Sequence, residues 1–441
     1  MIARAGAVDS PPPAVSALPS LSEHKLARFA AIVILYFMQG VPVGLTIIAI
    51  PAWLAANGAS PVQVAAIVGT AMLPWSLKLV NGLVMDRWAF KPMGRRRGWI
   101  LLAQALMASM LGALAILSPG AADLALLTGL CFALNICATF NDVAVDGMTV
   151  DLVPDEERAT VNSFMFAAQS TGIAATSFVA GQLLVLGSIT PTALILAGFV
   201  ALASLFVSIF RERPGERLLP WSAGEASREC KERQHDAWWP ILKGVFVSML
   251  APLTVLFLLS TGLAMATAAY QDAIAPTLAV QQLGWGSDSY SSFASAMSLL
   301  AALITALVAT FIVKTLGLRN AIIATFLVHA GAALFAAITY PSWEGDTIFS
   351  VVFFVQYVAH MMILVFTCTW AMRLCNPAVA ASQFALFMAV PNFARSLMSG
   401  NSGFVVEWGG YGAVFYCIAA IALLGLMLGL LARIGNARAL D

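Results

Sequence analysis

The chain has 441 residues, of which 60% are hydrophobic and only 10% are charged, whereas a soluble globular protein carries roughly 25% charged residues. So few charges cannot cover a water-exposed surface, which excludes an ordinary soluble protein. The formal net charge of +1 offers no basic surface for nucleic acid, so no nucleic-acid partner is expected. The apolar stretches are continuous, whereas the strands of a membrane β-barrel alternate over ~10 residues, so a barrel is excluded as well.

Twelve apolar segments are long enough to cross a bilayer, which takes about 20 residues of helix. They lie at 26–50, 62–85, 98–118, 122–147, 159–186, 190–210, 242–271, 289–313, 320–340, 347–371, 381–404 and 411–432. Helices satisfy their own backbone hydrogen bonds in lipid. We therefore expect an all-α polytopic membrane protein with twelve transmembrane helices, surrounded by the lipid bilayer.

One long polar stretch, 211–241, divides these segments into six plus six. Two helical bundles with a binding cavity between them are typical of secondary transporters. The expected parts are a disordered cytoplasmic N-terminal tail (1–25), an N-terminal six-helix bundle (26–210), a cytoplasmic linker loop (211–241), a C-terminal six-helix bundle (242–433) and a cytoplasmic C-terminal tail (434–441).

The positions of the 23 Lys and Arg residues predict the orientation. None of them lies in a loop that leads from an odd-numbered to an even-numbered segment, whereas the tails, the linker and the opposite loops are basic. The positive-inside rule then places both termini and the linker in the cytoplasm. The loops at 272–288 and 341–346 are expected on the outer side.

The loop from Gly82 to Gly98 combines an acid at the end of a helix with a basic turn. It resembles the signature loop of the major facilitator superfamily, in which the acid pairs with neighbouring helices and holds one face closed. The resemblance implies a cytoplasmic gate, whose candidate residues are Asp86, Arg87, Gly94, Arg95, Arg96 and Arg158. Alternatively, the arginines only enforce the orientation in the membrane.

Three polar residues of the fourth segment, Asn135, Asp142 and Asp146, fall on one helical face, because they are spaced by seven and four residues. Two carboxylates one turn apart disfavour joint ionisation, as a proton-carrying site requires. We expect Asp142 and Asp146 to bind the proton and Asn135 to contact substrate. Alternatively, both acids lie at the cytoplasmic mouth and pair with loop arginines such as Arg158.

Two cations and a histidine lie inside apolar segments. Arg395, deep within 381–404, requires a carboxylate, a phosphate or a substrate anion, or else a structural partner on another helix. Lys78 either faces the cavity or extends to the cytoplasmic interface. His360 is a candidate proton relay, or alternatively a neutral hydrogen-bonded histidine.

Further polar residues within the apolar segments are expected to line the substrate pathway. They are Tyr36, Gln39, Gln169 and Gln356. Asp272, at the outer end of the seventh segment, either joins them or is an ordinary interface residue. No nucleotide-binding GxxxxGK[ST] motif, acyl-transfer set or metal-ligand cluster occurs, so neither an enzyme nor a cofactor or metal is expected.

Longer stretches carry a more specific resemblance. They are Leu73–Lys78 with MDRW and GRRRGW, Asn141–Arg158, Leu374–Asn376 and Ser382–Leu386 followed by Arg395. They are similar to the AmpG-type muropeptide permease group of the major facilitator superfamily, which is related to siderophore importers and acetyl-coenzyme A transporters. The resemblance implies proton-driven import through a bacterial inner membrane, with Asp142, Asp146 and Arg395 at positions that match the group's motifs.

The chain departs from that group at two places. The seventh segment has Ser260-Thr261-Gly262-Leu263 where the group is expected to carry a charged pair, and the tenth has Val355-Gln356 where an acid is expected. These departures bear on the substrate more than on the transport mechanism.

From this sequence we expect a proton-coupled secondary transporter that imports a medium-sized anionic small molecule by alternating access, a mechanism for which a monomer suffices. The alternatives are a siderophore importer or a coenzyme A ester transporter of the same group, a non-transporting membrane sensor or assembly factor, and a drug exporter.

Overall fold

The computed structural model describes residues 20–232, 250–343, 345–374 and 380–431, and the described part is almost entirely helical. The first half contains α1 (Lys25–Val43), η1 (Gly44–Ala49), α2 (Ile50–Ala56), α3 (Pro61–Met72), η2 (Leu73–Leu77), α4 (Lys78–Arg87), η3 (Lys91–Met93), α5 (Arg97–Leu117), α6 (Leu124–Leu152), α7 (Asp155–Leu184) and α8 (Ile189–Ser208). The second half contains α9 (Arg228–Glu232), α11 (Pro252–Thr277), η4 (Leu278–Gln282), α12 (Ser287–Leu316), α13 (Leu318–Thr339), η5 (Tyr340–Ser342), α14 (Thr347–Leu374) and α15 (Ala380–Leu431).

Ten helical stretches of the described chain are long and apolar enough to cross a membrane. The expected segment 159–186 corresponds to α7, which has 30 residues. The last two expected segments both lie in α15, whose 52 residues contain a non-helical glycine, Gly410, with φ of 71°. A straight helix of this many residues would be roughly 78 Å long at 1.5 Å per residue, more than twice the ~30 Å hydrocarbon core. The break at Gly410 divides α15 instead into two passages.

Several expected boundaries differ from the structure, among them the end of the fourth segment, which continues to Leu152. The first segment continues past residue 50 to Ala56 through the π-helical turn η1. The seventh continues past residue 271 to Gln282, because Gln271 and Asp272 are directed inwards rather than marking the end of the helix. Residues 20–24, which we assigned to the disordered tail, are held in place: Leu21 N–H donates to the carbonyl of Arg211 at 2.8 Å.

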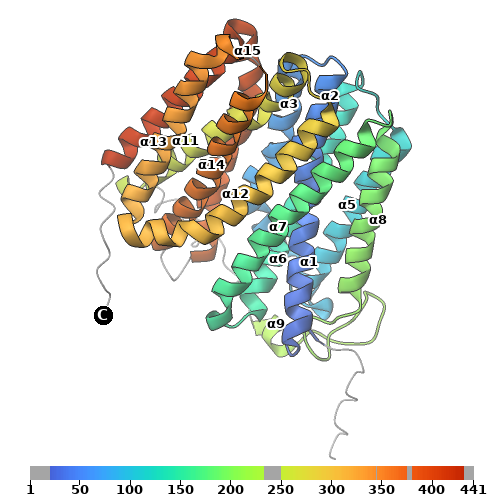
Figure 1. Ribbon diagram of the computed structural model, residues 1–441. Helices are drawn as coiled ribbons and strands as arrows, with labels where there is room; N and C mark the ends of the chain where they lie inside the picture. The colour runs from blue at the N-terminus through green and yellow to red at the C-terminus, as the bar shows by residue number, and fades with distance from the viewer. Residues whose placement is uncertain (1–19, 233–249, 344, 375–379, 432–441) are drawn as a thin grey trace, which may run out of the picture.

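The helices form two groups that meet along one side (Figure 1). We call α1 to α8 the first bundle and α11 to α15 the second bundle. Within the first bundle, α1 and α7 pack at backbone distance, because Gly40 and Gly172 face each other's helix and leave no room for a Cβ atom. Small residues permit this close approach, which is a common way for membrane helices to associate.

Between the bundles, α3 and α15 form a seal of small residues. A capping box of Ser60 and Gln63 starts α3 after a short turn from α2. A Cβ atom on Gly69 would lie 2.7 Å from the backbone nitrogen of Gly400, and one on Gly403 would collide with the backbone of Val62. The Ser396 hydroxyl donates to the carbonyl of Gly69 at 2.6 Å.

A second contact between the bundles joins α7 to α12. The hydroxyls of Ser177 and Ser295 lie 2.7 Å apart, and Gly181 packs against Ser291 without room for a Cβ atom. Gln281 of η4 donates to the carbonyls of two residues at the end of the first membrane passage, Ala55 at 2.9 Å and Ala59 at 2.8 Å. These contacts all lie at the end of the molecule opposite the linker.

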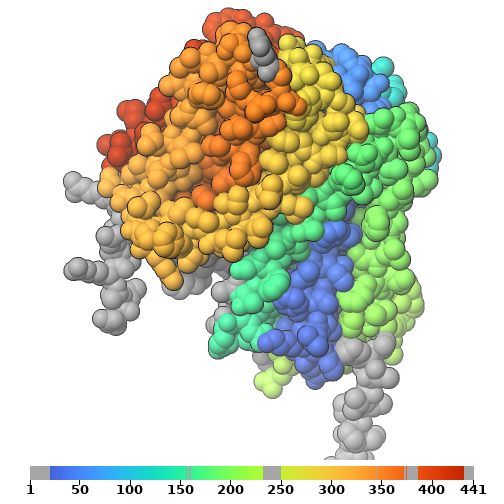
Figure 2. Space-filling model, viewed as in Figure 1, coloured from blue at the N-terminus to red at the C-terminus, as the bar shows by residue number. Residues whose placement is uncertain are grey.

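Towards the linker end the two bundles diverge. Figure 1 shows α12 and α7 side by side near the top of the view and separating below, and the space-filling view in Figure 2 shows the same divergence on the surface. The structure is therefore closed at the end formed by the α2–α3 and η4–α12 turns, and its bundles spread apart at the end that carries the linker.

The close contact of α3 with α15 predicts that one added methyl group in this seal will disturb closure of the bundles. Gly403→Ala should hold the closed end apart, because the new Cβ would collide with the backbone of Pro61 and Val62. Overpacking costs about 1–3 kcal/mol, so we expect the closed population to fall by roughly fivefold or more. Electron–electron distance measurements between spin labels at Asn57 and Gln282 should then show a longer component.

Gly331→Ala is the matched control, because nothing lies within 4 Å of a Cβ atom at Gly331. It should leave the distance distribution unchanged. An unchanged distribution in Gly403→Ala would show that the contact of α3 with α15 does not limit closure.

Candidate functional site

A charge network occupies the centre of the first bundle, on the face of α6 predicted from the sequence. Asp142 is 2% exposed. Its carboxylate forms an ion pair with the Lys78 ammonium and accepts a hydrogen bond from the Gln39 amide. One turn further along α6, the Asp146 carboxylate accepts a hydrogen bond from the Tyr36 hydroxyl. Four residues predicted for the site are thus brought together with Asp146.

Lys78 is placed by the chain that precedes it. The 3-10 turn η2, which contains Pro74, ends where α4 begins with Lys78. The ammonium lies 4.9 Å from the centre of the Trp75 ring, which is cation–π distance. Lys78 therefore points into the bundle towards Asp142, and the alternative that it extends to the cytoplasmic interface is wrong.

Asn135 has a different surrounding from the one we expected. It accepts a hydrogen bond from the Trp75 indole at 3.0 Å and donates to the Thr46 hydroxyl at 3.0 Å and to the carbonyl of Cys131 at 2.9 Å. These bonds occupy its amide group. Its geometry suits positioning of the Trp75 ring beneath Lys78 more than direct contact with a ligand.

The second bundle holds a separate ion pair. Arg395 of α15 donates to the Asp272 carboxylate of α11 at 2.5 Å, and their side chains are 22% and 11% exposed. Sequence reasoning identified Arg395 but kept Asp272 apart from it, because Asp272 follows the apolar run of its segment. The requirement of a buried guanidinium for a carboxylate was the signal that could have paired them.

Polar side chains of α14 extend this second pair. Gln356 and His360 are one helical turn apart and buried, and His360 is close enough to Arg395 for their charges to interact. His329 of α13, which sequence reasoning missed, is fully buried beside His360. Among the described residues, Gln356 Nε2, His360 Nδ1 and Arg395 Nε have no hydrogen-bond partner.

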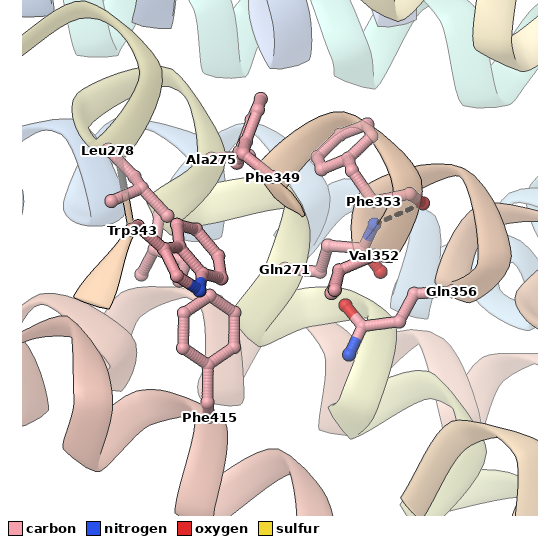
Figure 3. A pocket seen from close by; sticks show the side chains of 10 residues that line it. Gln271, Ala275, Leu278, Trp343, Phe349, Val352, Phe353, Gln356 and Phe415 are labelled. Atoms are coloured by element: carbon pink, nitrogen blue, oxygen red, sulfur yellow. Dashed lines mark hydrogen bonds between the residues drawn. The ribbon is translucent and has the colours of Figure 1, made fainter. Parts of the chain in front are cut away.

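A pocket with an empty volume of about 260 Å³, part of it open to the surroundings, lies in the second bundle, and Gln356 is one of the residues that line it. Figure 3 shows its aromatic walls, which include Trp343, Phe349 and Phe415, and two amides, Gln271 and Gln356. The Gln271 amide donates to the carbonyl of Phe353 at 3.2 Å. The walls are thus apolar apart from these two amides.

The two networks lie on opposite sides of the contact between the bundles. The Asn392 amide donates to the carbonyl of Trp75 at 3.4 Å. Lys78 and Arg395 each follow one of these contact residues by three positions, hence by about one helical turn. Each bundle therefore places one cation and its carboxylate near the shared interface.

The predicted gate forms a charge cluster on the linker side of the first bundle. Asp86 binds Arg95 at 2.9 Å and Arg96 at 2.8 Å, and both arginines lie within 3.8 Å of Asp151 at the end of α6. Arg87 instead lies against the Trp88 ring, at 6.0 Å. The side chain of Arg158 lies outside the described residues, and Gln169 lies where α7 packs against α1.

A residue of the linker, Glu212, fixes the arginine loop from behind. Its fully buried carboxylate accepts hydrogen bonds from the backbone N–H groups of Arg95, Arg96 and Arg97 at 2.9–3.1 Å. Such N–H groups have no partner within the helix that they begin, and an acid at a helix N-terminus is favourable. Gly94, with φ of 98°, leaves the room that Glu212 needs.

The family model of the Major Facilitator Superfamily matches residues 32–399, which is most of the chain. The chain belongs to the Major Facilitator Superfamily. The solved structures agree: the nucleoside transporter NupG has a TM-score of 0.66 at 14% identity, covering 91% of this chain and 97% of that one. A POT family transporter in complex with a thioalcohol-conjugated peptide has a TM-score of 0.65 at 11% identity, covering 92% and 95%.

Among the curated relatives of this Major Facilitator Superfamily chain are proteins named as a permease and a transporter. The anhydromuropeptide permease of Escherichia coli (strain K12) is 24% identical over 413 residues, covering 92% of this chain and 80% of the permease. The folate-biopterin transporter of Synechocystis sp. is 33% identical over 161 residues, covering 35% of this chain and 31% of that protein. The protein is therefore a multi-pass membrane transporter and not an enzyme, and the resemblance to the muropeptide permease group is confirmed.

The network around Asp142 predicts a double-mutant result. Lys78→Met should destabilise the protein by about 3 kcal/mol, because it leaves a buried carboxylate without its cation. Lys78→Met with Asp142→Asn should be closer to wild type, since both charges are then absent. Thermal unfolding in detergent measures the stability of Lys78→Met, Asp142→Asn and the double variant. A loss of stability in the double variant equal to the sum of the two single losses would contradict a direct pair.

Glu216 of the linker predicts a pH dependence. It is buried, accepts hydrogen bonds from the Arg213 N–H at 3.0 Å and the Ser227 hydroxyl at 2.6 Å, and burial raises its pKa from 4.5 to about 7. Because the folded pKa is raised, Glu216 favours the docked linker most below pH 4.5, and this contribution is lost as the pH rises through 7. Glu216→Gln should remove this loss.

Hydrogen exchange of residues 211–227, corrected for the intrinsic rate, should slow in Glu216→Gln relative to wild type at pH 8 but change little at pH 5. The exposed Glu225 supplies the matched control, and Glu225→Gln should behave as wild type. Equal protection of wild type and Glu216→Gln at pH 8 would contradict the assignment.

Proposed function

We propose that the protein imports a medium-sized anionic small molecule together with protons, by alternating access, through the inner membrane of a bacterium. The observation that carries this proposal is the network of Lys78, Asp142 and Asp146 in the first bundle. It contains the buried carboxylate of Asp142, the more exposed carboxylate of Asp146 one turn away, and one cation.

A proton is needed to balance this network. With both acids ionised, the charges of Asp142, Asp146 and Lys78 add to −1. A net charge beside the buried Asp142 is unfavourable, and two acids one turn apart disfavour joint ionisation. One proton on the pair restores neutrality. Asp142 and Asp146 therefore have the charge arrangement of a site that binds and releases a proton, with Tyr36 and Gln39 as its hydrogen-bond donors.

The proposed direction of opening follows from the charges of the loops. The bundles diverge at the linker end, and the basic loops favour a cytoplasmic position for this end and for both termini. The structure then corresponds to a state open to the cytoplasm. Asp86, Arg87, Gly94, Arg95, Arg96 and Arg158 would act as the gate that closes this end in the opposite state.

The two interface cations are the reason for proposing an anionic substrate. Lys78 and Arg395 supply positive charge on opposite sides of the bundle contact, and Gln356 adds a free amide donor. Similarity over most of the chain to a permease named for anhydromuropeptides supports a substrate of that kind. Siderophores and coenzyme A esters also carry anionic groups and remain the alternatives within the same mechanism.

The proton gradient can drive such import. One proton that enters through a potential of 100 mV releases about 2.3 kcal/mol, and a monovalent anion that enters with it costs the same amount. With one proton per anionic charge the accumulation therefore comes from the pH difference, about tenfold or 1.4 kcal/mol for each pH unit, and a second proton adds the work of the potential.

The test uses purified full-length protein in liposomes and a radiolabelled anhydromuropeptide. Uptake should be driven by an acid exterior and should collapse with a protonophore. Asp142→Asn should lower proton-driven uptake by roughly 100-fold, the loss expected when about 2.7 kcal/mol of coupling disappears, but leave exchange of internal for external substrate measurable.

Asp123→Asn is the control, because Asp123 is an exposed turn residue whose bond to the Gly120 N–H an asparagine can replace. Proton-driven uptake that survives in Asp142→Asn would remove this residue from the proton site. Uptake in wild type that does not respond to the protonophore would contradict proton coupling altogether.

A further inference from the structure

Arg395, which the proposed function assigns to the substrate anion, is already occupied. The Asp272 carboxylate lies 2.5 Å from its guanidinium. A substrate anion can reach this guanidinium only if Asp272 gives way. What breaks the ion pair of Arg395 with Asp272 is therefore a question that rests on the proposed function.

The surroundings of the pair contain more hydrogen-bond donors than acceptors. Arg395 Nε and Gln356 Nε2 are buried donors without a partner among the described residues. Buried donors without partners are costly, so a further acceptor is expected beside them. A carboxylate or phosphate oxygen of a ligand would satisfy both donors, whereas an apolar group would satisfy neither.

The charges that face Asp272 can be followed element by element. Arg395 comes from α15, His360 and Tyr357 from α14, and Tyr290 from α12, with His329 of α13 behind His360. The elements of the first bundle that pack against α11 are η1, α2 and α3, and their sequences contain no titratable residue. Arg395 is thus the permanent cation next to Asp272 in the described part of the chain.

We propose that the Asp272 carboxylate occupies the place of the anionic group of the substrate at Arg395. When this carboxylate takes up a proton, the Arg395 guanidinium exchanges Asp272 for the substrate anion. The proton binds a carboxylate oxygen of Asp272, the ion pair with Arg395 breaks, and the guanidinium binds the anion of the substrate. When the substrate leaves, the proton is released and Asp272 binds Arg395 again.

Charge balance fixes the ratio of this exchange. Before the exchange the site holds one cation and one carboxylate, and afterwards it holds the cation, a neutral acid and one substrate anion. The net charge of the site is zero in both states. A substrate anion that arrived without a proton would leave one uncompensated negative charge in apolar surroundings, which is disfavoured. One proton therefore accompanies each anionic group bound at Arg395.

This ratio predicts how binding depends on pH. Where Asp272 is ionised in the free protein, each unit of pH should weaken the binding of an anionic ligand tenfold through this site, because one proton must be bound with it. In Asp272→Asn, Arg395 is free at every pH, so affinity should rise at high pH and this tenfold dependence should disappear.

Calorimetry of the purified full-length protein with an anhydromuropeptide tests the exchange. Titrations in two buffers of different ionisation enthalpy give the number of protons taken up on binding. Asp272→Asn should take up one proton fewer than wild type and bind at least as tightly at pH 8, whereas a purely structural role would weaken binding. Asp272→Glu should restore the proton. The exposed Asp346 gives the control Asp346→Asn, which should match wild type.

Equal proton uptake in wild type and Asp272→Asn would overturn the inference. A derivative of the same peptide with all carboxylates amidated should bind without the pH dependence that Asp272 confers, and an equal dependence for both peptides would also overturn it.

Infrared difference spectra on changing the pH test Asp272 without any substrate. Wild type should show a protonated carboxylic acid band that is absent in Asp272→Asn and present in Asp142→Asn. If the peptide does not bind wild type, the proposed substrate fails, and this band alone decides the role of Asp272. Identical spectra of wild type and Asp272→Asn would overturn the inference while leaving the proton site at Asp142 intact.

Discussion

The cost of an uncompensated charge in apolar surroundings governs this molecule. A chain with so few charged residues retains two half-buried cations at the contact between its bundles. Each is held by a carboxylate of its own bundle: Lys78 by Asp142 and Arg395 by Asp272. Because both pairs are internal to a bundle, the bundles can tilt without exposing a charge to lipid. The contacts described above between the bundles, at Gly69, Ser177 and Gln281, are uncharged and break at little electrostatic cost.

The same division appears on the linker side. The cluster of Asp86, Arg95, Arg96 and Asp151 joins parts of the first bundle. Glu212 attaches the start of the linker to this cluster, so residues 211–227 belong mechanically to the first bundle. The connection between the bundles is therefore shorter than the polar stretch 211–241, and the first bundle with its attached linker moves as one body.

Periodicity and charge were enough to predict the helical architecture, the shared face of Asn135, Asp142 and Asp146 on α6, and two cations, Lys78 and Arg395, within membrane segments. Each of these features depends on local sequence. The signals are a run of apolar residues, a spacing of four residues between two acids, and a cation within an apolar segment, where a charge is costly. The partner of Arg395 was not predictable in this way, because Asp272 lies on a distant helix and ends an apolar run that the structure continues. The linker carboxylate that caps α5 and the buried His329 also depend on packing, and the amide of Asn135 is used by neighbours that only the fold brings near.

The seal of α3 against α15 has a consequence for the path between the two states. It consists of backbone packed on backbone at Gly69, Gly400 and Gly403, and dispersion forces of this kind lose a quarter to a half of their strength over a gap of about 0.5–1 Å. A slight separation therefore forfeits much of the attraction at once. Partly open arrangements gain neither the packing of the closed end nor the hydration of the open one. The closed and open conformations should therefore be the populated ones, with few molecules in conformations between them.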